Sequence, residues 1–227
     1  MVFVLCGIKL RQELNTNWYF IMRNRKNIQR RGRPKTLDND TVLNVAMYSY
    51  WAKGPGNISL NEICKTAKIS KPGLYREFGG EDGLMRSILI NYEKKILQPN
   101  LKMLESDRPF RNSLEDLISF ITNMDDSQNN PKGCLLVKMR ESQLALGKET
   151  QMQINSAKRY GLKKYENWIE WSRAKGEFNP TISSRFAALY IDAQVSGALS
   201  QLARGEKGSE VKKILSMAFS VFLHQQR

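Results

Sequence analysis

The chain has 227 residues, of which 41% are hydrophobic and 26% charged, as is typical of a globular protein with a substantial core. Its 36 Lys and Arg residues exceed its 22 Asp and Glu residues, and the net charge of +14 indicates an anionic partner, either nucleic acid or an acidic membrane surface. Three scattered cysteines and one histidine argue against a disulfide framework, a metal site or a His-based catalytic triad. We therefore expect a cytoplasmic protein without a cofactor.

The positive charge is concentrated at the N-terminus. Residues 1–35 contain nine Lys and Arg residues and one acidic residue, so they carry +8 of the total. We expect a disordered basic arm in which Arg31 and Arg33 lie on DNA phosphates or enter a minor groove. A solubilising tail is the alternative. Met22 offers a second start that would leave residues 1–21 as an upstream extension.

Apolar periodicity after Pro34 predicts helices, and strand patterns are scarce there. Gly54-Pro55-Gly56 and Gly79-Gly80 separate the early helices, and Pro99 is expected to kink or interrupt the chain beyond the fourth helix. The expected helices span about 39–53, 59–67, 71–78, 81–97, 112–126, 134–146, 149–175, 180–204 and 209–225.

The second and third of these helices, joined by Lys68-Ile69-Ser70, have the lengths and the turn of a helix-turn-helix. Ser59 and Glu62 form a capping box at the start of the first helix, and Ser70 can cap the second. Tyr75 can bond a phosphate, whereas Arg76 can reach a phosphate or a guanine edge. A small helical hairpin within a core is the alternative. The residues expected to contact DNA are Arg31, Arg33, Ser59, Ser70, Lys71, Pro72, Gly73, Tyr75 and Arg76.

Residues 32–97 contain, in order, Gly32-Arg33-Pro34, the first helix, Ile58-Ser59-Leu60-Asn61-Glu62-Ile63, Ile69-Ser70-Lys71 and Leu74-Tyr75-Arg76-Glu77-Phe78. In residue type, order and spacing this range resembles the TetR (tetracycline-repressor) family of bacterial transcription regulators. Gly133-Cys134-Leu135-Leu136 also resembles the start of a ligand-domain helix in many members. Three features depart from the family pattern: Lys68 replaces a frequent Gly in the turn, Pro72-Gly73 replaces a small residue plus Thr, and Glu81 replaces a phosphate-contacting Lys.

The resemblance implies an all-α protein with an N-terminal three-helix helix-turn-helix DNA-binding domain over residues 36–97. A C-terminal helical domain over residues 98–227 would bind a small effector and dimerise through its last two helices. The implied function is a ligand-responsive repressor that binds double-stranded DNA at a palindromic operator as a homodimer.

Aromatic and methionine side chains in the C-terminal part suggest a small-molecule pocket, although plain core packing is the alternative. The expected pocket residues are Phe120, Met124, Met139, Tyr160, Trp168 and Trp171. Cys134 lies near a helix start, where a lowered thiol pKa would permit redox sensing, and a buried structural thiol is the alternative.

The helix expected at 180–204 carries two apolar stripes and so must be covered on two sides. Phe186, Leu189, Tyr190 and Ala193 form the first stripe. We assign the second stripe to a partner copy, together with residues of the last helix. The expected dimer interface is Ile191, Val195, Gly197, Ala198, Leu199, Leu202, Ile214, Ala218 and Phe222.

Enzyme and membrane functions are less well supported. The sequence contains no GxxxxGK[ST], HExxH or GxSxG motif, so we expect no enzyme. A basic helical protein that binds an anionic membrane surface, or a small molecule without DNA regulation, remains the alternative. Its basic residues would share one amphipathic helix face. Here they precede a helix-turn-helix, which favours DNA.

Overall fold

A computed structural model describes residues 38–123, 130–179 and 181–223, and these residues form helices with no strand among them. The expected all-α fold is confirmed. Residues 37–227 form one compact unit. The expected arm with Arg31 and Arg33, and the expected pocket residue Met124, lie outside the described residues.

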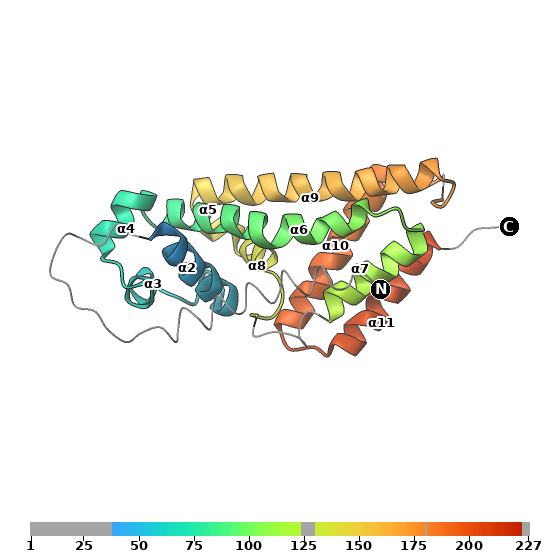
Figure 1. Ribbon diagram of the computed structural model, residues 1–227. Coiled ribbons are helices and arrows are strands. Elements are labelled where there is room, and N and C mark those ends of the chain that lie inside the picture. Colours follow the sequence, from blue (N-terminus) through green and yellow to red (C-terminus); the bar gives the residue numbers. More distant parts are fainter. Residues whose placement is uncertain (1–37, 124–129, 180, 224–227) are drawn as a thin grey trace. The chain divides into compact units, whose positions relative to one another are not determined.

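Four helices follow one another at the N-terminal side of this unit: α2 (Asn39–Lys53), α3 (Leu60–Ala67), α4 (Lys71–Phe78) and α5 (Glu81–Tyr92) (Figure 1). The ends of α2, α3 and α4 agree with the expected ranges to within one residue, because capping serines and glycines mark them in the sequence, whereas α5 was expected to reach residue 97 and ends at Tyr92. Neighbouring helices in this group pack around fully buried side chains from three of them, Ala46, Ile63 and Leu74. We call α2 to α5 the head and the helices from α6 onward the body.

Pro99 does not end the helix that leads from the head into the body. α5 continues through a π-helical turn, η1 (Glu93–Leu97), into α6 (Gln98–Leu101) and the 3₁₀ turn η2 (Lys102–Glu105). Proline has no backbone N–H, so it cannot take part in the regular hydrogen-bond ladder of an α-helix. The irregularity expected from Pro99 therefore takes the form of a wider turn just before it.

The body contains five longer helices: α7 (Phe110–Thr122), α8 (Leu135–Glu141), α9 (Lys148–Ala174), α10 (Ser184–Ala203) and α11 (Gly208–Phe219). Short 3₁₀ turns, η3 (Gln143–Ala145) and η4 (Ser220–Phe222), follow α8 and α11. α9 packs along α5 and α10, and α11 packs against α7 and α10 (Figure 1). None of the helices in the described part of the chain is long and apolar enough to cross a bilayer.

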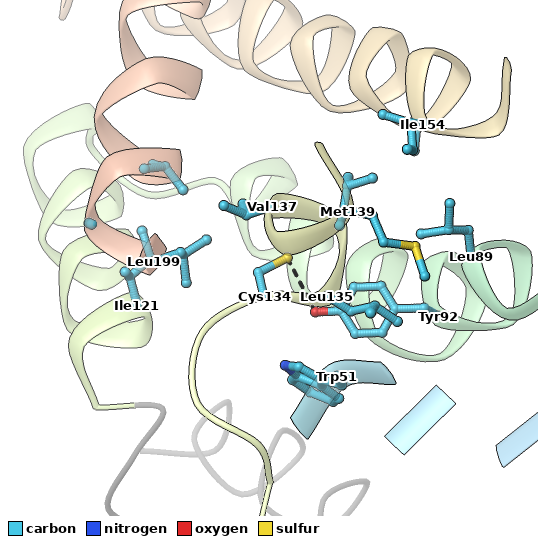
Figure 2. Close-up of a cluster of buried hydrophobic side chains, with 14 of the residues drawn as sticks. Trp51, Leu89, Tyr92, Ile121, Cys134, Leu135, Val137, Met139, Ile154 and Leu199 are labelled. Carbon is cyan, nitrogen blue, oxygen red and sulfur yellow. Dashed lines mark hydrogen bonds between the residues drawn. The ribbon is translucent and has the colours of Figure 1, made fainter. Parts of the chain in front are cut away.

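Trp51 of α2 joins the head to α8 of the body. The buried indole donates from Nε1 to the carbonyl oxygen of Gly133 at 3.0 Å, and its ring meets Tyr92 edge to face at 5.1 Å between centroids (Figure 2). Lys138 of α8 donates from Nζ to the carbonyl oxygen of Trp51 at 2.5 Å. This bond satisfies a last-turn carbonyl of α2 that has no helical partner. Gly133 is required here, because a Cβ would lie 2.7 Å from the Leu199 carbonyl oxygen.

Cys134 lies in the same buried cluster. Its Sγ accepts a hydrogen bond from the Tyr92 hydroxyl at 3.3 Å, as Figure 2 shows. Burial raises the pKa of the Cys134 thiol, which outweighs the hydrogen bonds that lower it. A lowered pKa of the kind that redox sensing would use is therefore absent, and the structure favours the alternative of a buried structural thiol.

Candidate nucleic-acid interface

The capping box fixes the start of α3. Ser59 Oγ accepts from the backbone N–H of Glu62 at 3.2 Å, and Glu62 Oε2 accepts from the backbone N–H of Ser59 at 2.9 Å. The Ser59 backbone bond is the main reason why the pKa of Glu62 is lowered from 4.5 to about 2. Two N–H groups that would otherwise lack partners at the helix start are thereby satisfied. The expected capping box is confirmed.

Lys68 adopts the left-handed conformation that the turn requires, with φ 55° and ψ 40°. The next residue, Ile69, is buried and donates from its backbone to the carbonyl oxygen of Cys64 at 3.0 Å. The turn therefore keeps its geometry although Lys68 is not glycine. The left-handed conformation of Lys68 costs about 1 kcal/mol of backbone strain.

Ser70 caps the start of α4. Ser70 Oγ accepts from the backbone N–H of Gly73 at 3.2 Å, and a Cβ on Gly73 would lie 3.1 Å from the same oxygen. Ser70, Lys71 and Pro72 are exposed. Gly73, which was expected to contact DNA, is buried, and its N–H is bonded to Ser70, while Pro72 has no N–H.

The outer face of α4 carries three exposed polar side chains. Lys71 and Arg76 are exposed, and Tyr75 keeps 48% of its surface in solvent, while Leu74 between them is fully buried. Within the described ranges, none of the three makes a side-chain hydrogen bond or ion pair. An exposed tyrosine and two cations on one short helix match the chemistry of phosphate and base-edge contacts.

The acidic residues near α4 are held by α2. Asn39 donates a side-chain hydrogen bond to the Glu77 carboxylate, and Tyr50 donates from its hydroxyl to Glu81 Oε1 at 3.4 Å. Glu81 is the residue that replaces the frequent family lysine, so its carboxylate has a partner within the head. The lysine-to-phosphate contact expected of the family is therefore not available from this position.

The structure does not bring the expected pocket residues together. Trp168 is buried and packs on Phe110, with ring centroids 4.9 Å apart. Met139 is buried elsewhere, near Leu89, Tyr92 and Ile154 (Figure 2). Phe120 is partly buried against the core. These positions agree with the alternative of core packing.

Two further residues of the expected pocket lie near the surface of α9. Tyr160 lies beneath the ammonium of Lys164 and Trp171 beneath that of Lys175, at 5.5 and 3.7 Å from the ring centroids. Lysine ammonium groups therefore lie over both rings, and the assignment of the two residues to a pocket stays a prediction. A surface hollow that the sequence did not suggest lies between α5 and α9. It is lined by Arg86, Glu149, Met152, Gln153, Asn155, Ser156 and Arg159.

The apolar stripe of α10 that was expected in the dimer interface is buried within the chain, and the other stripe faces solvent. Six residues of the expected interface are buried within the single chain, and five of them lie on α10, which packs against α7, α8, α9 and α11. They are Ile191, Val195, Ala198, Leu199, Leu202 and Phe222. Gly197 and Ile214 are exposed, and Ala218 is partly buried. The stripe that faces solvent instead includes Phe186 and Leu189 of α10 and Ile214, Met217 and Val221 near the C-terminus.

Comparison with known proteins identifies the family. The family model described as bacterial regulatory proteins, tetR family, matches residues 42–88, which run from α2 through the helix-turn-helix into α5. Residues 42–88 therefore form a DNA-binding domain of the TetR type. The chain that carries this domain is a DNA-binding transcriptional regulator and not an enzyme.

Two repressors of Escherichia coli (strain K12) are similar to this chain. The HTH-type transcriptional repressor ComR is 24% identical over 189 residues, which cover 83% of this chain and 89% of ComR. The HTH-type transcriptional repressor BdcR is 24% identical over 107 residues, which cover 47% of this chain and 54% of BdcR.

Solved structures of the TetR family share the fold. A cysteine-substituted CifR complexed with 26-bp double-strand operator DNA aligns with a TM-score of 0.71 at 20% identity, covering 84% of this chain and 100% of that one. Reduced NemR of E. coli aligns with a TM-score of 0.72 at 17% identity, covering 81% of this chain and 95% of that one.

Proposed function

We propose that this TetR family regulator is a ligand-responsive repressor that binds a palindromic operator as a homodimer. The observation that carries the proposal is the outer face of α4, where Lys71, Tyr75 and Arg76 are exposed without partners among the described residues. Similarity to ComR and BdcR, both transcriptional repressors, supports repression. A membrane-surface role is not favoured.

In the proposed complex α4 lies in the major groove. Tyr75 donates to a phosphate, Arg76 reaches a phosphate or a guanine edge, and Lys71 neutralises a phosphate. Ser70 and Pro72, exposed at the start of α4, approach the backbone above the buried Gly73, and Ser59 at the start of α3 approaches a neighbouring phosphate. Arg31 and Arg33 of the arm add phosphate or minor-groove contacts.

The proposed dimer is built on the exposed stripe of α10 and α11. Phe186 is 63% exposed and Met217 is 73% exposed, although both side chains are apolar. Apolar surface of this kind on two adjacent helices is typical of a contact face. Two helices from each copy would form a four-helix bundle around a two-fold axis. The two α4 helices would then be spaced by about one turn of DNA, ~34 Å.

The proposed effector is a small molecule that binds the body. Support comes from the resemblance to the TetR family, whose members are usually ligand-responsive. An effector releases DNA only if it binds the released state more tightly than the DNA-bound state. A ligand search would therefore measure operator release and binding to the protein together.

DNA binding is tested by selecting duplexes from a random pool with the wild-type protein and measuring affinity for the selected sequence. We expect log Kd to rise with log salt at a slope of about 0.9 per phosphate contacted. Tyr75→Ala should weaken binding to all duplexes, and Arg76→Ala should cost about tenfold or more on the selected site.

Arg111→Ala serves as the matched control, because Arg111 is an exposed arginine of α7, outside the head. It should bind the selected duplex like the wild type. If the wild-type protein enriched no sequence and bound random DNA with equal affinity, the proposed function would be wrong.

A further inference from the structure

The N-terminus of α9 lacks a cap from its own sequence. Its N-cap residue is Gly147, which has no side chain to accept the free N–H groups of the first turn. Asp82 of α5, which lies 67 residues before Glu149, accepts them instead. Its Oδ2 accepts from the backbone N–H of Glu149 at 3.0 Å, and its Oδ1 accepts from the backbone N–H of Thr150 at 2.9 Å.

Two further features make this contact specific. The hydroxyl of Thr150, a fully buried residue, donates to Asp82 Oδ1 at 2.6 Å. A Cβ on Gly147 would lie only 2.1 Å from the Asp82 carboxyl carbon. The carboxylate therefore fits against the helix start only because position 147 is glycine. A negative charge at this place also complements the dipole of α9.

Asp82 is directly coupled to the recognition helix. It lies in the first turn of α5, four residues after Phe78, the last residue of α4. The next residue, Gly83, allows α5 to approach α4 closely, because a Cβ there would lie 1.8 Å from the Phe78 carbonyl oxygen. At the other end of α5, Gln153 of α9 donates to Glu93 Oε2 at 3.0 Å. Since α4 and α5 are packed this tightly, a displacement of Asp82 displaces α4.

We propose that Asp82 is a positioning residue for DNA recognition: by capping α9 from the head, it sets the orientation of α4 relative to the body. This inference rests on the proposed DNA-binding role of α4. It further assigns α9 as the element through which the body moves the head, because a shift of the α9 start pulls on the Asp82 carboxylate. The contact should matter most when two heads must meet two half-sites at a fixed spacing.

The experiment compares a selected palindromic duplex with a duplex that contains one half-site. Asp82→Asn places an amide against one of the N–H donors, and Gly147→Ala forces the carboxylate away without changing charge. Each variant should bind the palindrome about tenfold more weakly and the half-site within about twofold of the wild type. A palindrome with one extra central base pair provides a second test. The extra base pair should reduce the affinity of each variant by a smaller factor than it reduces the affinity of the wild type.

Matched controls distinguish the loss of the Asp82 contact from two other effects of the substitutions, namely the loss of a negative charge and the replacement of a glycine. Glu149→Gln removes one negative charge beside the contact but leaves its backbone N–H in place, and Gly161→Ala adds a Cβ on α9 where nothing lies within 4 Å. Both should bind like the wild type. Thr150→Val should show a smaller palindrome defect than Asp82→Asn, and Thr150→Ser should restore wild-type binding.

Three results would overturn the inference. Unchanged palindrome binding in both Asp82→Asn and Gly147→Ala would show that the contact does not orient α4. An equal loss on the half-site would show that Asp82 maintains the head itself. A wild-type protein that prefers no sequence would refute the proposed DNA-binding role, on which the inference depends, and this outcome differs from the other two because the variants are not needed to see it.

Discussion

Lys68 is the single non-glycine residue with a positive φ in the part of the chain that the structure describes. Its side chain is exposed, so the strain is not offset by packing. We expect Lys68→Gly to increase the free energy of unfolding by about 0.5–1 kcal/mol, because glycine reaches this conformation without strain. Urea denaturation measures the change.

Lys68→Ala is the control for this variant, because it removes the charge but keeps the Cβ. It should not be more stable than the wild type. A stabilisation by Ala equal to that by Gly would show that the lysine charge, and not the backbone, limits the stability of the turn.

Glu62 links the stability of α3 to pH. Its pKa is lowered from 4.5 to about 2 in the folded protein, chiefly by the backbone N–H of Ser59. A lowered folded-state pKa means that the stabilisation is complete above pH 4.5 and is lost as pH falls from 4.5 toward 2. Glu62→Gln cannot titrate.

The melting temperature of the wild type should therefore exceed that of Glu62→Gln at pH 6, and the difference should shrink between pH 4.5 and 3. Thermal melts followed by circular dichroism at each pH provide the measurement. A difference between the two proteins that stays constant over this range would contradict the role of the charged carboxylate.

At the scale of helices, an ion pair joins α8 to α10. Arg140 donates from its two terminal nitrogens to the two carboxylate oxygens of Asp192, at 3.1 and 2.9 Å, and their side chains are only 21% and 17% exposed. Asp192→Ala leaves the arginine without this partner in a poorly hydrated place. We expect a loss of about 1–3 kcal/mol in the free energy of unfolding.

An exposed ion pair on α11 provides the comparison. Lys213 and Glu210 lie 3.0 Å apart, with 74% and 56% of their side chains in solvent. Lys213→Ala should change stability by no more than about 0.5 kcal/mol, because exposed pairs gain little from their charges. Chemical denaturation of both variants tests the contrast, which fails if the two losses are equal.

Helix positions were largely predictable from the sequence, because capping residues, glycines and apolar periods act locally. The ends of α2 and α4 were predicted to the residue, and Ser59 was identified as a cap. The inward face of α10 was not predictable. Both of its stripes are apolar, and the choice between them depends on which neighbouring helices cover Ile191 and Leu199.

The site was predictable to a similar degree. Lys71, Tyr75 and Arg76 were expected to contact DNA, and the structure agrees that they are exposed, whereas Gly73, expected beside them, is buried. Asp82 was missed because its partners are distant in sequence and no local pattern pairs them. Trp168 and Trp171, three residues apart on α9, were treated alike, although one is buried and the other lies under Lys175.

At the scale of the whole molecule, the exposed stripe predicts the assembly state. Met217→Asp and Phe186→Asp each place a charge in the proposed contact face, so each should convert the dimer to a monomer at micromolar concentration. Sedimentation velocity measures the change. The monomer should lose tight binding to the palindrome, because only one recognition helix remains per particle.

Leu144→Asp is the control, because Leu144 is also apolar, is 98% exposed and lies in η3, outside the stripe. It should remain a dimer. A wild-type monomer, or a Met217→Asp variant that still sediments as a dimer, would show that the contact face lies elsewhere.

The junction at Trp51 limits how freely this head can be exchanged between proteins. Its indole and last-turn carbonyl depend on Gly133 and Lys138, which lie about 80 residues further along the chain. A chimera that transplants residues 36–97 onto a foreign body would expose this tryptophan and leave the Trp51 carbonyl without its lysine. A functional graft of the head would therefore have to include residues 133–138. The residues that this DNA-binding head needs are thus encoded in two separate segments of the gene.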